Sequence, residues 1–318
     1  MQKNILVMGA VGQIGSELTT RLRAIYGESR VVASDIRLPS YETLQQGPFE
    51  IHDATDGART VAILYQHNIG LIYNLPALLS ATAEQFPQKA FEINLVGLHR
   101  TLEAARTCGC AVFTPSTIGV FGDNTPKDNT PQDTIMRPST MYGVTKVAGE
   151  LLCDYYFHKY GLDVRGVRYP GIISNKTLPG GGTTDYAVEI FYKALETGHY
   201  TSYLKADTQL DMMYMPDALN AAIQLMEADA THFRHRNAFN VTAMNFDVAT
   251  LAAEIKKHLP HFEVEYHIDP LRQSIADSWP NKLDDSEARA QWNWQPTYDL
   301  ASMTTDMVNS LKDRISKK

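Results

Sequence analysis

The stretch Tyr142-Gly143-Val144-Thr145-Lys146 places a phenol and an ammonium four residues apart. Residues at positions i and i+4 of a helix share one face, so the two groups can meet. A nearby ammonium favours the phenolate, and we expect the pKa of Tyr142 to fall from its usual value of about 10 toward neutrality. Such a phenolate can accept the proton of an alcohol while a hydride leaves the carbon. The spacing is common by chance, so its meaning depends on the residues around it.

Two hydroxyl residues, Ser116 and Thr117, follow the apolar run Ala111–Phe113 and the dipeptide Thr114-Pro115. A hydroxyl at the end of a strand can hydrogen-bond a reacting oxygen. The candidate catalytic residues are therefore Tyr142, Lys146, Thr117 and Ser116. Asn94 lies in a predicted long helix, where it either supports the cofactor side of the site or is an ordinary helix-surface amide.

A glycine-rich turn, Gly9-Ala10-Val11-Gly12-Gln13-Ile14-Gly15, follows the first apolar run and opens the first helical pattern. Glycines at these places permit a tight turn, close approach of a pyrophosphate and close packing of helix on strand. The helix N-terminus then offers N–H groups and a positive dipole end to phosphates. The predicted contacts of a dinucleotide here are Gly9, Val11, Gly12, Gln13, Ile14 and Gly15. The alternative is a strand–helix turn that merely requires glycine.

Two acidic residues are placed to read the rest of the dinucleotide. Asp35 ends the second strand pattern, where a carboxylate accepts both ribose hydroxyls and repels a 2′-phosphate, so we predict NAD. Arg37 could accommodate that phosphate, which keeps NADP as the alternative. Asp53, with Ala54 beside it, is placed to meet the adenine amino group. A helix N-cap is the other role open to Asp53.

Apolar runs alternate with helical patterns through the first half of the chain. The predicted strands are Asn4–Met8, Arg30–Ala33, Leu71–Leu75, Ala111–Pro115 and Asp163–Arg168, and the predicted helices are Gln13–Tyr26, Ala58–Asn68, Phe86–Thr107 and Met141–Tyr160. Continuous apolar strands separated by helices indicate an α/β fold with a doubly wound parallel sheet, the Rossmann type.

The sequence pattern of the chain changes after about Tyr169. Loop signals and polar, proline-bearing stretches follow, with helices predicted at Asp217–Met226 and Val248–His258. We therefore predict an NAD-binding Rossmann domain over residues 1–169. Residues 170–318 would form mainly a substrate-binding lobe, with some segments returning to the Rossmann core.

The amino-acid composition excludes several classes of binding partner. The net charge of -7 argues against a nucleic-acid backbone or an anionic membrane as the main partner. The three cysteines, Cys108, Cys110 and Cys153, form neither a disulfide framework nor a zinc-ligand set, so we expect no metal. No leader pattern or run of about 18 apolar residues is present in the sequence, and we expect a cytoplasmic protein.

Together these motifs resemble the extended short-chain dehydrogenase/reductase family. Its glycine turn, its Ser/Thr followed by V-[YF]-G, and its Y-x-x-x-K correspond to Gly9–Gly15, Thr117–Gly122 and Tyr142–Lys146. Met8 departs from the pattern, which usually has Thr before the first glycine. The resemblance implies NAD, with Leu75, Asn94, Tyr142, Lys146, Tyr169 and Ile172 among its contacts. It also implies a homodimer that pairs the helices Phe86–Thr107 and Met141–Tyr160.

Further segments resemble the threonine-oxidising branch of that family, the short-chain L-threonine 3-dehydrogenases. They are Asn74–Ala81, Pro115–Ile118, Arg168–Ser174, Pro179–Ala187, Met212–Ala218, Asp277–Pro280 and Leu283–Ser286. This resemblance implies oxidation of a small molecule, L-threonine, to L-2-amino-3-oxobutanoate, in threonine catabolism toward glycine. The implied substrate contacts are Ser80, Thr117, Tyr142, Gly182, Thr183, Thr184 and Trp279.

The substrate contacts have competing explanations. Ser80, Thr183, Thr184 and backbone N–H groups around Gly182 would bind the carboxylate, or would serve only loop and helix-cap chemistry. Trp279 would close the pocket as an apolar lid, or would pack in the core of the lobe.

Two other functions stay open at this point. A sugar-nucleotide epimerase or dehydratase could use the same scaffold, and turnover of a UDP-sugar without threonine activity would reveal it. A non-catalytic dinucleotide-binding protein would bind NAD without turnover, although such proteins often lack the Tyr or the Lys that this chain has.

Overall fold

A parallel sheet of six strands carries the first half of the chain. The computed structural model describes residues 3–39, 42–176, 180 and 182–315. In spatial order the strands are β3 (Phe49–Ile51), β2 (Val31–Asp35), β1 (Asn4–Met8), β4 (Ile69–Asn74), β5 (Ala111–Phe113) and β7 (Val164–Arg165). The order reverses at β1, so the chain winds outward in both directions. The predicted doubly wound α/β fold is confirmed.

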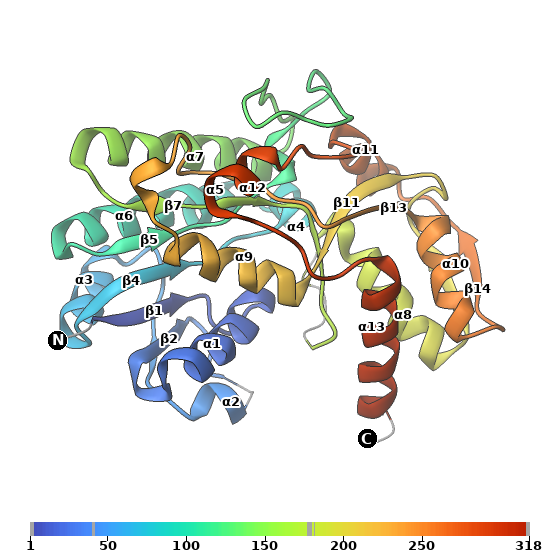
Figure 1. Cartoon of the computed structure of the whole chain (residues 1–318), viewed down its shortest axis with the longest axis horizontal. Coiled ribbons are helices and arrows are strands. Elements are labelled where there is room, and N and C mark those ends of the chain that lie inside the picture. The colour runs from blue at the N-terminus through green and yellow to red at the C-terminus, as the bar shows by residue number, and fades with distance from the viewer. Residues whose placement is uncertain (1–2, 40–41, 177–179, 181, 316–318) are drawn as a thin grey trace.

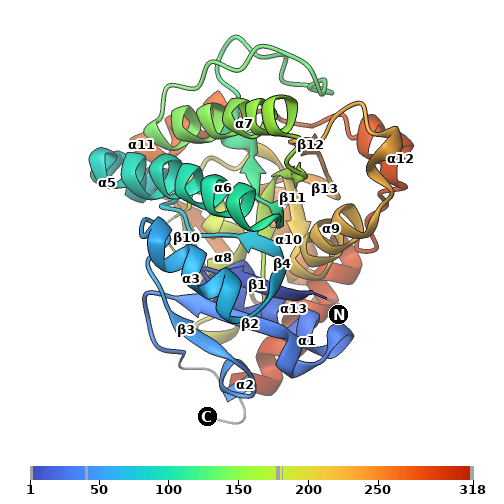
Figure 2. The same cartoon turned by 90° about the vertical axis from the view of Figure 1, so that its left-hand side faces the viewer.

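Alternating side chains of β1 reach two different cores. Leu6 and Met8 pack under α3 (Gly57–Gln66), α6 (Gly97–Cys108) and α7 (Met141–Tyr160). Ile5 and Val7 pack under α1 (Gln13–Tyr26) and α9 (Met215–Glu227). Figures 1 and 2 show the two helical layers on opposite faces of the sheet. Burial on both faces explains why the strand is apolar throughout.

Three smaller sheets continue from the first. One has the order β12 (Phe239–Asn240), β8 (Val167–Tyr169) and β6 (Ser116–Thr117), and a second has the order β13 (Met244–Asp247), β11 (Gln209–Tyr214) and β9 (Gly171–Ile173). The third pairs β10 (His199–Ser202) with β14 (Glu263–Tyr266). A separate apolar core joins α8 (Tyr186–Glu196), α10 (Val248–His258) and α13 (Leu300–Ile315), on the right of Figure 1. The division of the chain at residue 169 stays a prediction.

Shorter helices complete the chain. They are α2 (Glu42–Gln45), α4 (Ser80–Gln85), α5 (Pro87–Phe91), α11 (Pro270–Ser278) and α12 (Ser286–Trp292), with single helical turns at Glu28–Arg30, Ile118–Val120, Thr183–Asp185 and Ala230–His232.

Two predicted elements have a different form. The predicted helix Phe86–Thr107 consists of α5, a π-helical turn at Glu92–Val96 and α6. The predicted strand Asp163–Arg168 is divided into β7 and β8, which belong to different sheets. In both cases the local apolar pattern is continuous, but tertiary contacts change the backbone within it.

Candidate active site

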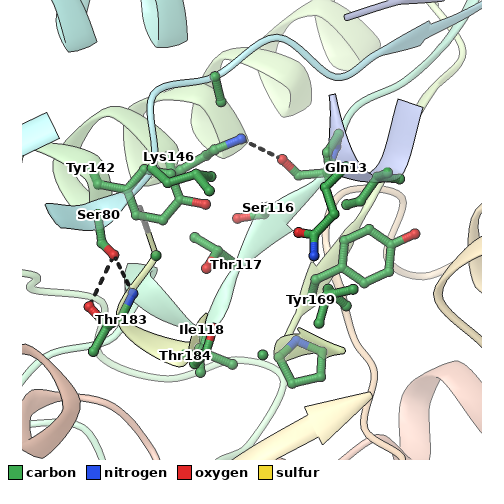
Figure 3. Close-up of a pocket in the computed structure, with 18 of the residues that line it drawn as sticks. Gln13, Ser80, Ser116, Thr117, Ile118, Tyr142, Lys146, Tyr169, Thr183 and Thr184 are labelled. Atoms are coloured by element: carbon green, nitrogen blue, oxygen red, sulfur yellow. Dashed lines mark hydrogen bonds between the residues drawn. The ribbon is translucent and has the colours of Figure 1, made fainter. Parts of the chain in front are cut away.

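A cavity opens between the carboxyl ends of the central strands and the second lobe. Its lining includes the predicted residues Gln13, Ile14, Leu75, Ser80, Ser116, Thr117, Tyr142, Lys146, Tyr169, Ile172, Gly182, Thr183, Thr184 and Trp279. The cavity is also lined by residues that lie within the segments carrying the resemblance but received no individual role, namely Ala77, Leu79, Pro115, Ile118, Pro170, Gly171 and Asp185. In Figure 3, Gln13 and Tyr169 lie across the cavity from Ser80 and Tyr142.

Tyr142 lies in the first turn of α7, which is held close to the turn after Thr117. Thr140 caps the helix by accepting the N–H of Gly143 at 3.1 Å. A Cβ at Gly143 would lie 2.2 Å from the carbonyl oxygen of Gly119. Only glycine allows this approach, which brings Tyr142 and Thr117 to one wall of the cavity.

The ionisation of Tyr142 differs from the expectation based on its spacing to Lys146. Burial raises the pKa of Tyr142, and the hydroxyl of Thr117 opposes the rise. The Lys146 ammonium lies 5.9 Å from the centre of the phenol ring and donates to the carbonyl oxygen of Pro115 at 2.8 Å, the dashed line from Lys146 in Figure 3. Burial lowers the pKa of Lys146 to about 8. The predicted fall of the Tyr142 pKa is not found in this structure, because burial is the largest influence on the phenol and the opposing influence comes from the Thr117 hydroxyl.

A buried ion pair lies behind the catalytic residues. Glu150, two turns after Tyr142 on α7, pairs with Arg168 at 2.8 Å, and the two side chains are 4% and 5% exposed. Ser116 donates its hydroxyl to the same carboxylate. The proton of Ser116 is therefore directed at Glu150, whereas its oxygen still lines the cavity. Glu150 could have been suspected from its i+4 spacing to Lys146, but no local pattern indicated Arg168.

The glycine turn has the geometry that an anion site needs. Gly9 has φ 74°, and a Cβ at Gly15 would lie 2.1 Å from the carbonyl oxygen of Gly9. Helix α1 begins at Gln13 without an acidic residue in its first turn. Its first N–H groups can therefore face a phosphate.

Asp35 fixes the glycine turn from the neighbouring strand. Its Oδ2 accepts the N–H of Val11 at 2.9 Å, and its Oδ1 accepts the N–H of Arg37 at 3.1 Å. The Arg37 side chain also pairs with this carboxylate, at 3.4 Å. The acid therefore lies beside the turn, at the place where a ribose adjoins a pyrophosphate in such folds.

The structure excludes one of the two roles predicted for Asp53 and one of the two predicted for Asn94. Asp53 accepts the N–H and hydroxyl of Thr55, whereas the N-cap of α3 is Asp56. The N-cap role proposed for Asp53 is therefore wrong. Asn94 is buried in the π-helical turn and bonds both backbone groups of Leu78, at 2.8 and 3.1 Å, so it is no surface amide. The contacts of Asp53, Ala54 and Asn94 with a cofactor stay predictions.

Ser80 and Thr183 join the two lobes across the cavity. Their hydroxyl oxygens are 3.1 Å apart, and Ser80 also accepts the N–H of Thr183 at 3.3 Å, as Figure 3 shows. The N–H of Gly182 donates to Asp185 at 2.7 Å. The predicted backbone donors at residues 182 and 183 are thus already engaged in this structure. Pro179 and Gly181 lie outside the described residues.

Trp279 belongs both to the cavity and to the core. It is the C-cap residue after α11 and is 5% exposed, packed in the apolar core of the second lobe while lining the cavity. It is therefore a fixed wall in this structure, and the two roles predicted for it are compatible. Within the described ranges, no cluster of His, Cys, Asp and Glu could hold a metal ion.

The chain matches a known protein family over more than half of its length. The family model described as NAD dependent epimerase/dehydratase family matches residues 5–241, which include the glycine turn, Asp35, Thr117 and the Tyr142–Lys146 pair. The chain belongs to this family. The predicted resemblance to extended short-chain dehydrogenases and the predicted cofactor, NAD, are confirmed, and the chain is an enzyme of an NAD-dependent family.

Several relatives of the family match over almost the whole chain. An uncharacterised epimerase/dehydratase of Staphylococcus haemolyticus is 50% identical over 99% of this chain and 100% of its own length. The solved L-threonine dehydrogenase of Clostridium difficile is 54% identical, with a TM-score of 0.96 over 98% of each chain. That of Phytophthora infestans is 46% identical, with a TM-score of 0.95 over 98% of this chain and 100% of its own.

Proposed function

We propose that this enzyme oxidises the 3-hydroxyl of L-threonine to L-2-amino-3-oxobutanoate with NAD, in threonine catabolism toward glycine. Two solved structures that share 46% and 54% of its sequence are L-threonine dehydrogenases. The observation that carries the proposal is one cavity that combines Tyr142, Thr117 and Lys146 with the hydroxyl pair Ser80 and Thr183. The first three suit alcohol oxidation, and the pair suits a small carboxylate.

Each catalytic side chain has a distinct task in this reaction. Bound NAD supplies the acceptor for the hydride that leaves C3 of threonine. Tyr142, as phenolate, takes the proton of the 3-hydroxyl. Thr117, whose hydroxyl already interacts with Tyr142 and opposes the effect of burial, hydrogen-bonds the reacting oxygen. The Lys146 ammonium, 5.9 Å from the centre of the phenol ring, would add a positive charge near the phenolate.

The zwitterionic substrate needs donors for its carboxylate. Ser80 and Thr183 have two hydroxyl protons between them and use one in their mutual hydrogen bond. The other proton remains available to a ligand. Leu79, Ile118 and Trp279 supply apolar lining for the methyl group of threonine. Gly182 and Thr184 complete this end of the cavity.

The test is NADH formation from L-threonine, with L-serine and L-allo-threonine measured beside it, by wild type and by Tyr142→Phe. We expect L-threonine to be preferred and the variant to lose about 10²-fold or more in kcat, because the phenol oxygen that accepts the proton is absent. Tyr73→Phe is the matched control, since Tyr73 is a buried tyrosine of β4 outside the cavity lining. Turnover of UDP-sugars without threonine activity would instead identify an epimerase or dehydratase.

We also propose a cytoplasmic homodimer that pairs the layer of α5, α6 and α7 with the same layer of a second copy. Exposed apolar side chains gather there, with Leu151 and Tyr155 on α7 at 60% and 51% exposure. Figure 2 shows these helices side by side on the outer face of the molecule. The three cysteines are free thiols, as a reducing compartment favours. No helix among the described residues is long and apolar enough to cross a membrane.

A further inference from the structure

A buried carboxylate outside the cavity holds the segment that follows Trp279. Asp211 lies on β11 and is 1% exposed. Its Oδ2 accepts the backbone N–H of Leu283 at 2.6 Å, and its Oδ1 accepts the side-chain amide of Asn245 at 3.0 Å. The same amide also donates to the backbone carbonyl of Asn281. Asp211 therefore fixes two points of the chain just after Trp279-Pro280.

The other side of this segment is bonded to the loop between the catalytic residues. Lys127 and Thr130 lie between Thr117 and Tyr142 in the sequence, and they exchange four backbone hydrogen bonds of 2.9 to 3.1 Å with residues 281–284. The segment is thus held between β11 and the loop that leads into α7. Movement of this segment would move the wall formed by Trp279.

The contacts by which Asp211 holds the segment after Trp279 depend on the charge of its carboxylate. An ionised carboxylate only accepts hydrogen bonds, and the N–H groups of Leu283 and Asn245 that face it can only donate, whereas a protonated carboxyl would direct an O–H at one of its partners. Burial raises the pKa of Asp211 to about 6, against the hydrogen bonds from Leu283, Thr242 and Asn245 and the charge of Lys282. The other charged groups on the elements packed here are Asp247 of β13, Asp284 and Asp285 at the end of the held segment, and Lys127 and Asp128 of the loop bonded to it.

We propose that Asp211 is a positioning residue for the substrate, which keeps Trp279 against the cavity by holding the backbone that follows it. The hold is complete above the pKa of Asp211 and is lost as the pH falls through it, since the raised pKa belongs to a carboxylate whose ionised form makes the contacts. The identity of the substrate rests on the proposed function, whereas the hold on Trp279 does not.

The first test separates threonine binding from cofactor binding. Asp211→Asn keeps the shape but can accept only one of the two donors, so we expect the KM for L-threonine to rise about tenfold at pH 7.5. The Kd for NAD and kcat at saturating threonine should change less than twofold. In wild type the threonine KM should rise below pH 6, and in Asp211→Asn this dependence should be absent. Asp154, whose pKa burial also raises to about 6, is retained in the variant, so a remaining dependence would assign it to Asp154 and overturn the proposal.

The control is Asp247→Asn on the adjacent strand. Asp247 caps α10 by accepting the N–H of Thr250, and asparagine caps equally well, so its KM should match wild type. A threonine KM of Asp211→Asn within twofold of the control would also overturn the inference.

A second measurement needs neither activity nor a stable Asp211 variant. Trp292→Phe combined with Trp294→Phe leaves Trp279 as the sole tryptophan of the chain. Its emission should shift to longer wavelength, and acrylamide should quench it more, between pH 7.5 and pH 5.5. Unchanged emission across this range would refute the hold on Trp279. A shift in a protein that does not oxidise threonine would retain the hold and reject only the substrate.

Discussion

Ser116 and Thr117 are neighbours in one short strand, but their hydroxyls have different partners. Ser116 donates to Glu150, whereas Thr117 interacts with Tyr142. We expect Thr117→Val to lower kcat about 10²-fold, because it removes a hydrogen bond to the reacting oxygen without changing the volume. Ser116→Ala should cost less than tenfold, since Arg168 still pairs with Glu150. Steady-state kcat for the two variants checks this, and equal losses would return Ser116 to a direct catalytic role.

At the residue scale, the sequence predicted that Tyr142 and Lys146 lie near each other, but it did not predict their pKa values. The four-residue spacing of Tyr142 and Lys146 follows from helix geometry alone. Their pKa values depend on burial, which the rest of the molecule produces, and burial acts on both groups against the ionised form. The side-chain types therefore indicated the chemistry, while the electrostatics required the structure.

At the scale of elements, the turn between β1 and α1 sets the cofactor site. A methyl group at residue 15 would collide with the carbonyl oxygen of Gly9, so the start of α1 would have to move away from β1. We expect Gly15→Ala to fold and to bind NAD at least about tenfold more weakly, because the N–H groups of the helix shift away from the phosphates. Fluorescence titration with NADH measures this loss.

Gly57→Ala is the matched control variant for Gly15→Ala. Gly57, like Gly15, lies in the first turn of a helix, but a Cβ there meets only the flexible side chain of Arg100, at 3.3 Å. Its NAD affinity should match wild type. Equal binding by both variants would mean that α1 does not set the cofactor affinity.

The local sequence pattern is sufficient to predict the bounds of several helices and strands. The predicted bounds of β1, α1, α7 and α10 agree with the structure, because each has an uninterrupted period and a clear start or stop such as Gly161 after α7. The π-helical turn at Glu92–Val96 was not predictable, since its residues fit an α-helix equally well. It forms where Asn94 must reach Leu78, a contact that no local spacing encodes.

At the scale of the whole molecule, the exposed apolar layer on α7 bears on assembly. We expect Leu151→Glu with Tyr155→Glu to convert a dimer into a monomer, because two charges per copy would be buried at a self-complementary interface. Light scattering after size-exclusion chromatography gives the mass, and Lys312→Glu on the exposed side of α13 is the charge control. A wild-type mass of one chain would reject the proposed dimer.

The contacts that complete the site also belong to this scale. Ser80 and Thr183 are 103 residues apart in sequence, and Ser116 and Glu150 are 34 apart. Resemblance indicated Ser80 and Thr183, whereas no motif assigned a role to Glu150 or Asp211. The pairing of Ser80 with Thr183 depends on how the two lobes contact each other, and that of Ser116 with Glu150 depends on how α7 packs beside β6. Sequence periodicity contains no information about either contact.

The π-helical turn restricts how sequences of this kind can change in length. Each residue of a regular helix advances the direction of its side chain by about 100°. Deleting one residue within Glu92–Val96 would restore regular pitch, but it would rotate Asn94 relative to Leu98 and Leu102, which pack on the sheet. Either the amide would leave Leu78 or the apolar stripe would leave its core. Insertions and deletions should therefore be tolerated in the loops around this helix and rejected within it.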